Sequence, residues 1–277
     1  MQGRPSTRGT APTSCRGPCH LREDALKQLS PATTPPPSGL RAALRHEDDK
    51  QAWVDWLFSR VARRYDLGND IMSLGWHTRW KERLIERAAP QPGEHVLDLA
   101  CGTGDVTLKI APRVAPGVVV GTDINPQMMA CARGKPAPGS GSVRWVGADA
   151  TYLPFADGSF DLVTCAYAGR GFPDWPATLR EVHRVLRPGG RFLNLDFARP
   201  PSPAWDRAYR GWMIVSGAVL GTVLHKNPKT YVYIPMSMGA YPGQRWLDAR
   251  MREIGFDTRL EETLGCLMAY NIGLKAP

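Results

Sequence analysis

Short apolar runs alternate with longer helix-like stretches along most of this 277-residue chain, and this alternation limits the possible folds more than any other feature. Five of the runs have strand length, at residues 95–100, 117–122, 143–147, 161–166 and 191–197. Helix-like stretches lie between them at 104–112, 126–133 and 174–187. Because strands separated by helices form βαβ units, we predict an α/β fold with a doubly wound, mostly parallel sheet and helices on both faces.

The C-terminal third extends this pattern. Residues 212–224 form the longest apolar stretch, which at 13 residues is too short to span a membrane. We interpret it as a buried helix or as a surface that touches lipid or an apolar substrate. A helix is expected over 243–254, and two closing strands over 256–262 and 265–272 bring the sheet to seven strands.

Two helices are predicted ahead of the first strand. Residues 51–62 place Trp53 and Trp56 on one face of an amphipathic helix. A second helix is expected over residues 70–89, where Pro90 follows and ends it. Because these helices precede the alternating pattern, we expect them to form an N-terminal helical cap on the α/β domain.

Residues 1–45 differ in composition from the rest of the chain. They are rich in Pro, Ser and Thr, and they carry seven Lys or Arg against two Asp or Glu. Without apolar periodicity such a segment cannot build a core, so we expect a disordered basic tail ahead of one domain at 46–277. The Arg-rich start resembles a transit peptide, and a variable tail or an upstream start codon are the alternatives.

Charge and cysteine content narrow the classes of function. The formal charge is +9, but the tail accounts for more than half of it. A mildly basic domain argues against nucleic-acid binding and suits transient contact with a membrane surface. Cys15, Cys19 and His20 have no second pair at zinc spacing, so we expect no metal site. Free cysteines favour a reducing compartment and a cytoplasmic protein.

Polar residues stand where three of the predicted strands end. The first strand leads into residues 98–105, DLACGTGD, whose two glycines let the backbone approach a ligand closely. Asp123 ends the second strand and can accept hydrogen bonds from both hydroxyls of a ribose. Asp149 follows the third strand and can accept from an exocyclic amine. Each aspartate alone is often only a helix cap, but together they indicate a nucleoside site beyond the strand ends.

This spacing differs from a dinucleotide fingerprint, because Thr107 occupies the place of the third glycine. It resembles the pattern of the class I S-adenosylmethionine-dependent methyltransferases, whose Rossmann-like fold binds S-adenosylmethionine at these positions. The resemblance gives the following candidate cofactor residues: Asp98, Gly102, Thr103, Gly104, Asp123, Ile124, Asp149, Ala150 and Ala166.

Two further segments indicate one family within this class of methyltransferases. Residues 65–80, YDLGNDIMSLGWHTRW, resemble a signature of the demethylmenaquinone and polyprenyl-benzoquinol C-methyltransferases, with Gly68 in place of the usual Met. Residues 184–197 resemble the second signature of the same family. After the fourth strand that family usually reads SFGLRN, whereas this chain reads AYAGRG at 166–171. Arg170 is kept there, but the serine hydroxyl and the terminal amide are lost.

The resemblance implies methylation of a ring carbon in a prenylated quinol, with demethylmenaquinol as the expected substrate and menaquinol as the product. This is the last step of menaquinone biosynthesis. A ubiquinone or phylloquinone precursor, another small molecule, and a non-catalytic S-adenosylmethionine-binding partner are the alternatives. We expect no nucleic-acid partner and a cytoplasmic enzyme that contacts the membrane peripherally, while a homodimer is left open.

A quinol ring carbon becomes a good nucleophile only when a neighbouring hydroxyl ionises, and a phenol titrates near about 10. The site therefore needs a cation or a base. Arg170 follows the fourth strand and can stabilise the phenolate with its fixed charge. His77, Asp66 and Tyr65 lie in the first signature and are the candidates for handling the proton. Packing within the cap, or a turn between its helices, is the alternative role for these three.

Overall fold

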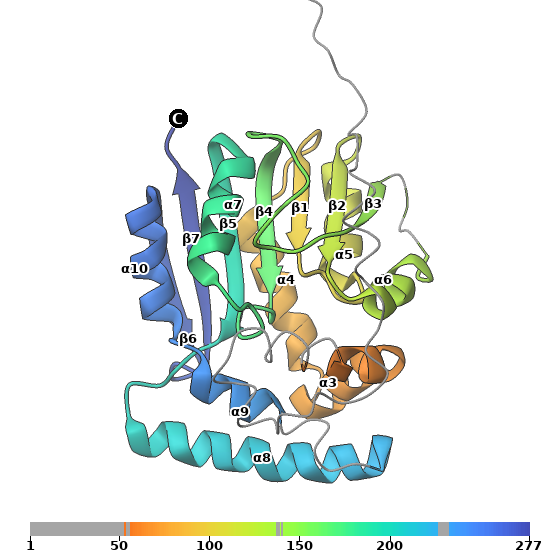
Figure 1. The fold of residues 1–277 in the computed structure, drawn as a ribbon, viewed down its shortest axis with the longest axis vertical. Helices are drawn as coiled ribbons and strands as arrows, with labels where there is room; N and C mark the ends of the chain where they lie inside the picture. The colour runs from red at the N-terminus through yellow and green to blue at the C-terminus, as the bar shows by residue number, and fades with distance from the viewer. Residues whose placement is uncertain (1–52, 54–55, 137–138, 140, 227–232) are drawn as a thin grey trace, which may run out of the picture.

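The computed structural model describes residues 53, 56–136, 139, 141–226 and 233–277. Its centre is a seven-stranded sheet in the order β3-β2-β1-β4-β5-β7-β6 (Figure 1). The strands are β1 (His95–Leu99), β2 (Val118–Asp123), β3 (Ser142–Gly147), β4 (Phe160–Ala166), β5 (Leu186–Phe197), β6 (Phe256–Thr263) and β7 (Met268–Lys275). The first five strands run parallel, and β7 is antiparallel to both of its neighbours. The predicted fold class is confirmed.

Helices cover both faces of the sheet and its lower edge in Figure 1. They are η2 (Ala62–Arg64), α3 (Tyr65–Ser73), α4 (Trp76–Ala88), α5 (Asp105–Val114), α6 (Pro126–Arg133), α7 (Trp175–Val185), α8 (Pro203–His225), α9 (Tyr233–Ala240) and α10 (Gln244–Ile254). The short helices η2 and α3 belong to the cap. The predicted tail at 1–45 and the start of the predicted helix at 51–62 lie outside the described residues.

The core forms two layers because side chains alternate along each strand. In β1, Val96 packs into the layer under α4 and α5, whereas its neighbour Leu97 packs under α7 and α10. Leu162 and Val163 of β4 divide between the two layers in the same way. A central parallel sheet that is buried on both faces requires apolar residues on both faces, which is why these strands read as continuous apolar runs in the sequence.

The cap departs from the prediction of one helix over 70–89. The structure divides this segment at Leu74 and Gly75, whose φ angles of 51° and 77° are left-handed. Two consecutive left-handed residues end an α-helix, so α3 stops at Ser73 and α4 starts in a new direction at Trp76. The break turns α3 across the carboxyl ends of the strands, where the candidate site is expected.

Helix α8 lies beyond the carboxyl ends of the parallel strands, beside α3 and α9 (Figure 1). Ser202 caps it by accepting from the backbone N–H of Trp205, and Pro203 occupies its first turn. The apolar run at 212–224 is thus the middle and end of a longer helix. Over the described part of the chain, no helix has the combination of length and apolar character that crossing a bilayer requires.

Candidate active site

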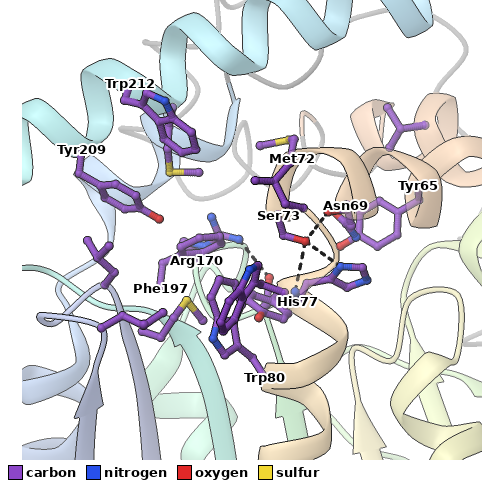
Figure 2. A pocket seen from close by; sticks show the side chains of 18 of the residues that line it. Tyr65, Asn69, Met72, Ser73, His77, Trp80, Arg170, Phe197, Tyr209 and Trp212 are labelled. Atoms are coloured by element: carbon purple, nitrogen blue, oxygen red, sulfur yellow. Dashed lines mark hydrogen bonds between the residues drawn. The ribbon is translucent and has the colours of Figure 1, made fainter.

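Two connected hollows lie at the end of the sheet where the parallel strands have their carboxyl ends. The cofactor cleft, of about 110 Å³, runs along the loops after β1, β2 and β4, and narrower extensions continue it at both ends. A larger apolar cavity of about 340 Å³ lies between the cap, α8 and the sheet (Figure 2). Phe58, Tyr65, Tyr167 and Arg170 line both hollows and mark their junction.

The loop after β1 positions the cofactor cleft through two glycines with different roles. Gly102 has a φ of 56° and no atom where a Cβ would lie, so its backbone faces open space in the cleft. Gly104 has a φ of 79°, but a Cβ there would collide with the ring of Trp145. Packing against the sheet therefore explains Gly104, and only Gly102 leaves room for a ligand. Of the two, Gly104 is absent from the cleft lining.

Two carboxylates line the cleft where the sequence predicts a nucleoside. Asp123 accepts the backbone N–H groups of Gly102 and Asn125, each at 2.8 Å, which fixes the carboxylate at the end of β2. Asp149 accepts both the backbone N–H and the hydroxyl of Thr151 through the single atom Oδ1. Between the two, Ile124 and Phe172 form apolar walls suited to a flat ring.

Asp98 takes a different position from the other predicted cofactor residues. Its two oxygens accept from the hydroxyls of Thr107 at 2.6 Å and Thr164 at 2.8 Å. Burial raises the pKa of the Asp98 carboxyl to about 6, and the two hydroxyls oppose that shift. Although Asp98 borders the narrow end of the cleft, its hydrogen bonds support the loop from beneath.

A buried lysine that the sequence analysis missed faces the same narrow end. Lys81 of α4 lines it together with Thr103 and Ala166, and its Nζ lies 2.9 Å from Asp105 Oδ2. The side chain of Lys81 is only 8% exposed. Lys81 directly follows Trp80, the last residue of the first signature, and this position in the sequence could have identified it as a site residue. An ammonium group there offers a partner for an anionic end of a bound molecule.

The remaining predicted cofactor residues are distributed along the cleft. Gly102, Asp123, Ile124 and Ala166 line its centre, Thr103 lies at the narrow end, and Asp149 and Ala150 lie at the opposite extension. This arrangement suits S-adenosylmethionine, because one end presents a cation, the centre a carboxylate for ribose, and the other end apolar walls beside Asp149. The roles of these residues remain predictions.

The two signature residues Tyr65 and Asp66 face different surroundings. Asp66 accepts from the hydroxyl of Thr103 at 2.7 Å and from Lys135 Nζ at 2.6 Å, so it joins the cap to the cofactor loop. It lies outside the lining of the apolar cavity. Tyr65 lines both hollows at their junction. The structure therefore brings Tyr65 to the place where a substrate would meet the cofactor, and uses Asp66 to attach the cap.

His77 lines the apolar cavity near the break between α3 and α4. The hydroxyl of Ser73 donates to the backbone oxygen of Asn69 at 2.7 Å, and Nδ1 of His77 lies 2.9 Å from the same hydroxyl oxygen (Figure 2). Because the hydroxyl proton is already used, we assign the imidazole proton to Nδ1, which leaves Nε2 as the basic nitrogen. Burial, followed by the charge of Lys81, lowers the pKa of His77.

Arg170 is held at the junction by a buried ion pair. Its Nε donates to Asp196 Oδ1 at 2.9 Å and its Nη2 to the backbone oxygen of Tyr167 at 3.3 Å. The guanidinium also lies over the ring of Phe197, with 4.6 Å between its carbon and the ring centroid. Burial raises the pKa of the Asp196 carboxyl, and the charge of Arg170 opposes the shift. Asp196 lies within the second signature at 184–197, but the sequence analysis did not predict this pairing.

Several polar atoms around the apolar cavity lack a partner. Among the residues that the structure describes, Arg170 Nη1, the Tyr167 hydroxyl and Trp80 Nε1 are buried cavity-lining groups without a hydrogen-bond partner. Buried polar groups are rarely left unpaired, so these three are candidate partners for the polar atoms of a ligand or a water molecule. Figure 2 also shows Tyr209 of α8 with its hydroxyl turned toward Arg170. The sequence analysis missed Tyr209 and the role of Tyr167, because both depend on contacts between distant segments.

Comparisons with known proteins agree on the family. The model of the ubiE/COQ5 methyltransferase family matches residues 45–275. A demethylmenaquinone methyltransferase of Thermus thermophilus is 40% identical over 217 residues, which cover 78% of this chain and 99% of that protein. A ubiquinone/menaquinone biosynthesis C-methyltransferase of Teredinibacter turnerae is 38% identical over 82% of this chain and 93% of its own length.

Solved structures show the same fold at low identity. A methyltransferase of Haloferax volcanii, in complex with its activator, has a TM-score of 0.58 at 17% identity and covers 79% of this chain and 98% of its own. A phosphoethanolamine N-methyltransferase of Haemonchus contortus, bound to S-adenosylhomocysteine, has a TM-score of 0.55 at 16% identity over 87% of this chain and 61% of its own. The resemblance read from the sequence is confirmed: the chain belongs to the ubiE/COQ5 methyltransferase family and is an S-adenosylmethionine-dependent methyltransferase.

Proposed function

We propose that this enzyme methylates a ring carbon of a prenylated quinol, with demethylmenaquinol as the substrate and menaquinol as the product. The names of the relatives support a quinone precursor as the methyl acceptor. The observation that carries the proposal is the junction of the two hollows, where an apolar cavity with unpaired buried polar atoms meets a cleft suited to S-adenosylmethionine.

The cavity suits a quinol better than a strongly polar acceptor. Aromatic and aliphatic side chains form most of its wall, and the polar groups gather near Arg170 and near His77. A quinol carries hydroxyls on an otherwise apolar ring, so one hydroxyl can lie among these polar groups while its ring remains in apolar contact. Pockets of this kind use a few placed polar groups to fix orientation.

The chemistry requires a methyl donor and an activated ring carbon. Bound S-adenosylmethionine supplies a methyl group that is already activated as a sulfonium. Arg170 stabilises the phenolate form of the quinol through Nη1, the donor that neither Asp196 nor Tyr167 occupies. A negative charge on that oxygen increases electron density at the neighbouring ring carbon, which takes the methyl group as the methyl–sulfur bond breaks. The same carbon then loses its ring proton to solvent, and the ring regains its aromaticity. Alignment between the cleft and the cavity supplies the remaining reduction of the barrier.

His77 is the proposed acceptor for the phenolic proton. A lowered pKa keeps its imidazole neutral near pH 7, as a base requires. With its proton on Nδ1, His77 offers Nε2, which lies 3.4 Å from the hydroxyl of Thr78, as the basic nitrogen that takes the proton through a water molecule. Tyr65, at the junction, orients the substrate ring against the cofactor. Asp66 contributes by holding the cap on the loop that carries Thr103.

The test is turnover of defined quinols by the purified protein. Demethylmenaquinol, kept reduced under anaerobic conditions, should gain one methyl group from S-adenosylmethionine, and mass spectrometry of the product measures it. The oxidised quinone should remain unmethylated, because it has no hydroxyl to ionise. A demethylated benzoquinol of equal tail length is the matched alternative acceptor. Methylation of neither quinol would contradict the proposal, and methylation of the benzoquinol alone would reassign the substrate.

A further inference from the structure

Helix α8 presents an apolar face to solvent. Trp212, Val215, Val219 and Val223 are 59%, 65%, 60% and 72% exposed, and their spacing of three or four residues places them on one side of the helix. The opposite side packs inward through Met213 and other buried residues. Surface helices of globular proteins ordinarily turn charged residues outward, so an outward apolar stripe marks an interaction surface.

The stripe continues around the mouth of the apolar cavity. Leu74 and Trp76 at the cap break, and Leu264 in the turn before β7, are exposed and also line the cavity. Trp212 belongs to both the stripe and the cavity lining. We call this combined surface, α8 residues 212–223 with Leu74, Trp76 and Leu264, the apolar rim. The cavity therefore opens onto the apolar rim.

The charges at the ends of α8 favour an anionic partner. The part of α8 between Arg210 and its last residue, His225, contains no charged side chain. Asp206 is the single acid of the helix, and Arg210 pairs with it at 2.6 Å. Arg207 and Lys226 are exposed near the two ends of the helix. The apolar stripe is thus bordered by positive charge, which is the arrangement of a helix that lies in the interface of an anionic membrane.

We propose that the apolar rim docks on the surface of a lipid bilayer that contains anionic lipids, with α8 lying in the plane of the interface. Trp212 and Trp76 suit the headgroup region, where tryptophan side chains are enriched, and the valines of α8 suit the acyl boundary. A symmetric contact with a second copy of this chain would bring the positive charges of two α8 helices toward one another, which a bilayer surface avoids.

Docking explains how a prenylated acceptor reaches the site, and this part rests on the proposed function. A cavity of about 340 Å³ is at the low end of the range for small-molecule pockets, so it holds a ring and the start of a tail. The rest of a polyprenyl tail must leave through the mouth. With the apolar rim on the bilayer, the tail remains among acyl chains while the ring enters the cavity.

The test is binding of the full-length protein to vesicles that contain no quinol. Vesicles of phosphatidylcholine with phosphatidylglycerol should carry the wild-type protein in a flotation assay, and pure phosphatidylcholine should carry less. The variant Val215→Asp/Val219→Asp should lower the partition coefficient at least about tenfold, because it places two charges in the stripe. Leu274→Asp is the control, since Leu274 is 47% exposed near the C-terminal end of β7. That end of β7 lies at the end of the sheet away from α8 (Figure 1).

Each outcome has a defined meaning. Equal vesicle binding by the wild type and the double variant, or no binding by the wild type, would overturn the proposal. A wild-type dimer in light scattering that the double variant converts to a monomer would assign the apolar rim to a second copy. Thermal melting checks that the variants are folded. Because the assay contains no quinol, vesicle binding can succeed while the proposed methylation fails, and the two hypotheses are judged separately.

Discussion

Replacing Arg170 with Met tests the junction most fully, because this residue forms a buried ion pair and has a proposed catalytic role. Its side chain is 8% exposed, and that of its partner Asp196 is 2% exposed. Removing one member of a buried ion pair typically costs about 3–5 kcal/mol, since the other charge is left without a partner. In a domain of this size, a loss of that order lowers the melting temperature by roughly 10 °C.

The same substitution should slow turnover more than the stability loss explains. Arg170 Nη1 is the proposed donor to the phenolate, and loss of one such donor lowers the rate by about 10²–10³. The defect should fall on kcat, because the charge develops in the transition state. It should shrink at high pH, where the quinol ionises without help, with a phenolic pKa near about 10.

The double variant Arg170→Met/Asp196→Asn separates the two roles. It removes both charges together, while the Asn side-chain oxygen can still accept from the backbone N–H of Phe197. We expect it to regain most of the lost melting temperature and none of the lost turnover. Recovery of turnover together with stability would show that Arg170 acts only by holding the structure. Near-normal turnover of the single variant at neutral pH would refute its catalytic role.

Three further predictions concern the cofactor cleft, the loop and pH. Asp123→Ala should weaken S-adenosylmethionine binding by roughly 1–3 kcal/mol, measured by calorimetry, because the ribose hydroxyls lose their acceptor; unchanged affinity would remove Asp123 from the site. Gly104→Ala should lower the melting temperature, because its Cβ meets the Trp145 ring, whereas Gly102→Ala should spare stability more. The folded-state pKa of His77 lies below its ordinary value of 6.5. The contribution of His77 to the free energy of unfolding is therefore present above pH 6.5 and is lost as pH falls through the folded-state pKa. His77→Gln should reduce this loss of stability in acid, measured by denaturant titration at several pH values, and an unchanged pH profile would contradict the shift.

The sequence predicts the sheet well because its signals are local. The strand runs follow from apolar periodicity, and α6 begins where the Asn125 side chain caps its first turn. The break at Leu74 was missed because Gly75 alone is a weak stop signal inside a helical pattern. Helix α9 was missed as well, since its apolar residues show no helical face in the sequence.

The candidate site is only partly readable from the sequence, for a physical reason. Asp123 and Asp149 are found by their place after strands, which topology brings to one edge. The pairing of Arg170 with Asp196 joins residues 26 apart on neighbouring loops and strands. The approach of Tyr209 to Arg170 depends on how α8 packs. Motifs identify the residues at strand ends, whereas the partners of those residues are set by tertiary packing.

The most direct test of the central claim is the quinone content of cells that lack this enzyme, measured by mass spectrometry. We expect accumulation of a menaquinone precursor that lacks one methyl group. The wild-type chain should restore the missing methyl, and Arg170→Met/Asp196→Asn should fail to restore it even when its protein level is normal. A quinone profile that is unchanged by the deletion would contradict the proposed reaction.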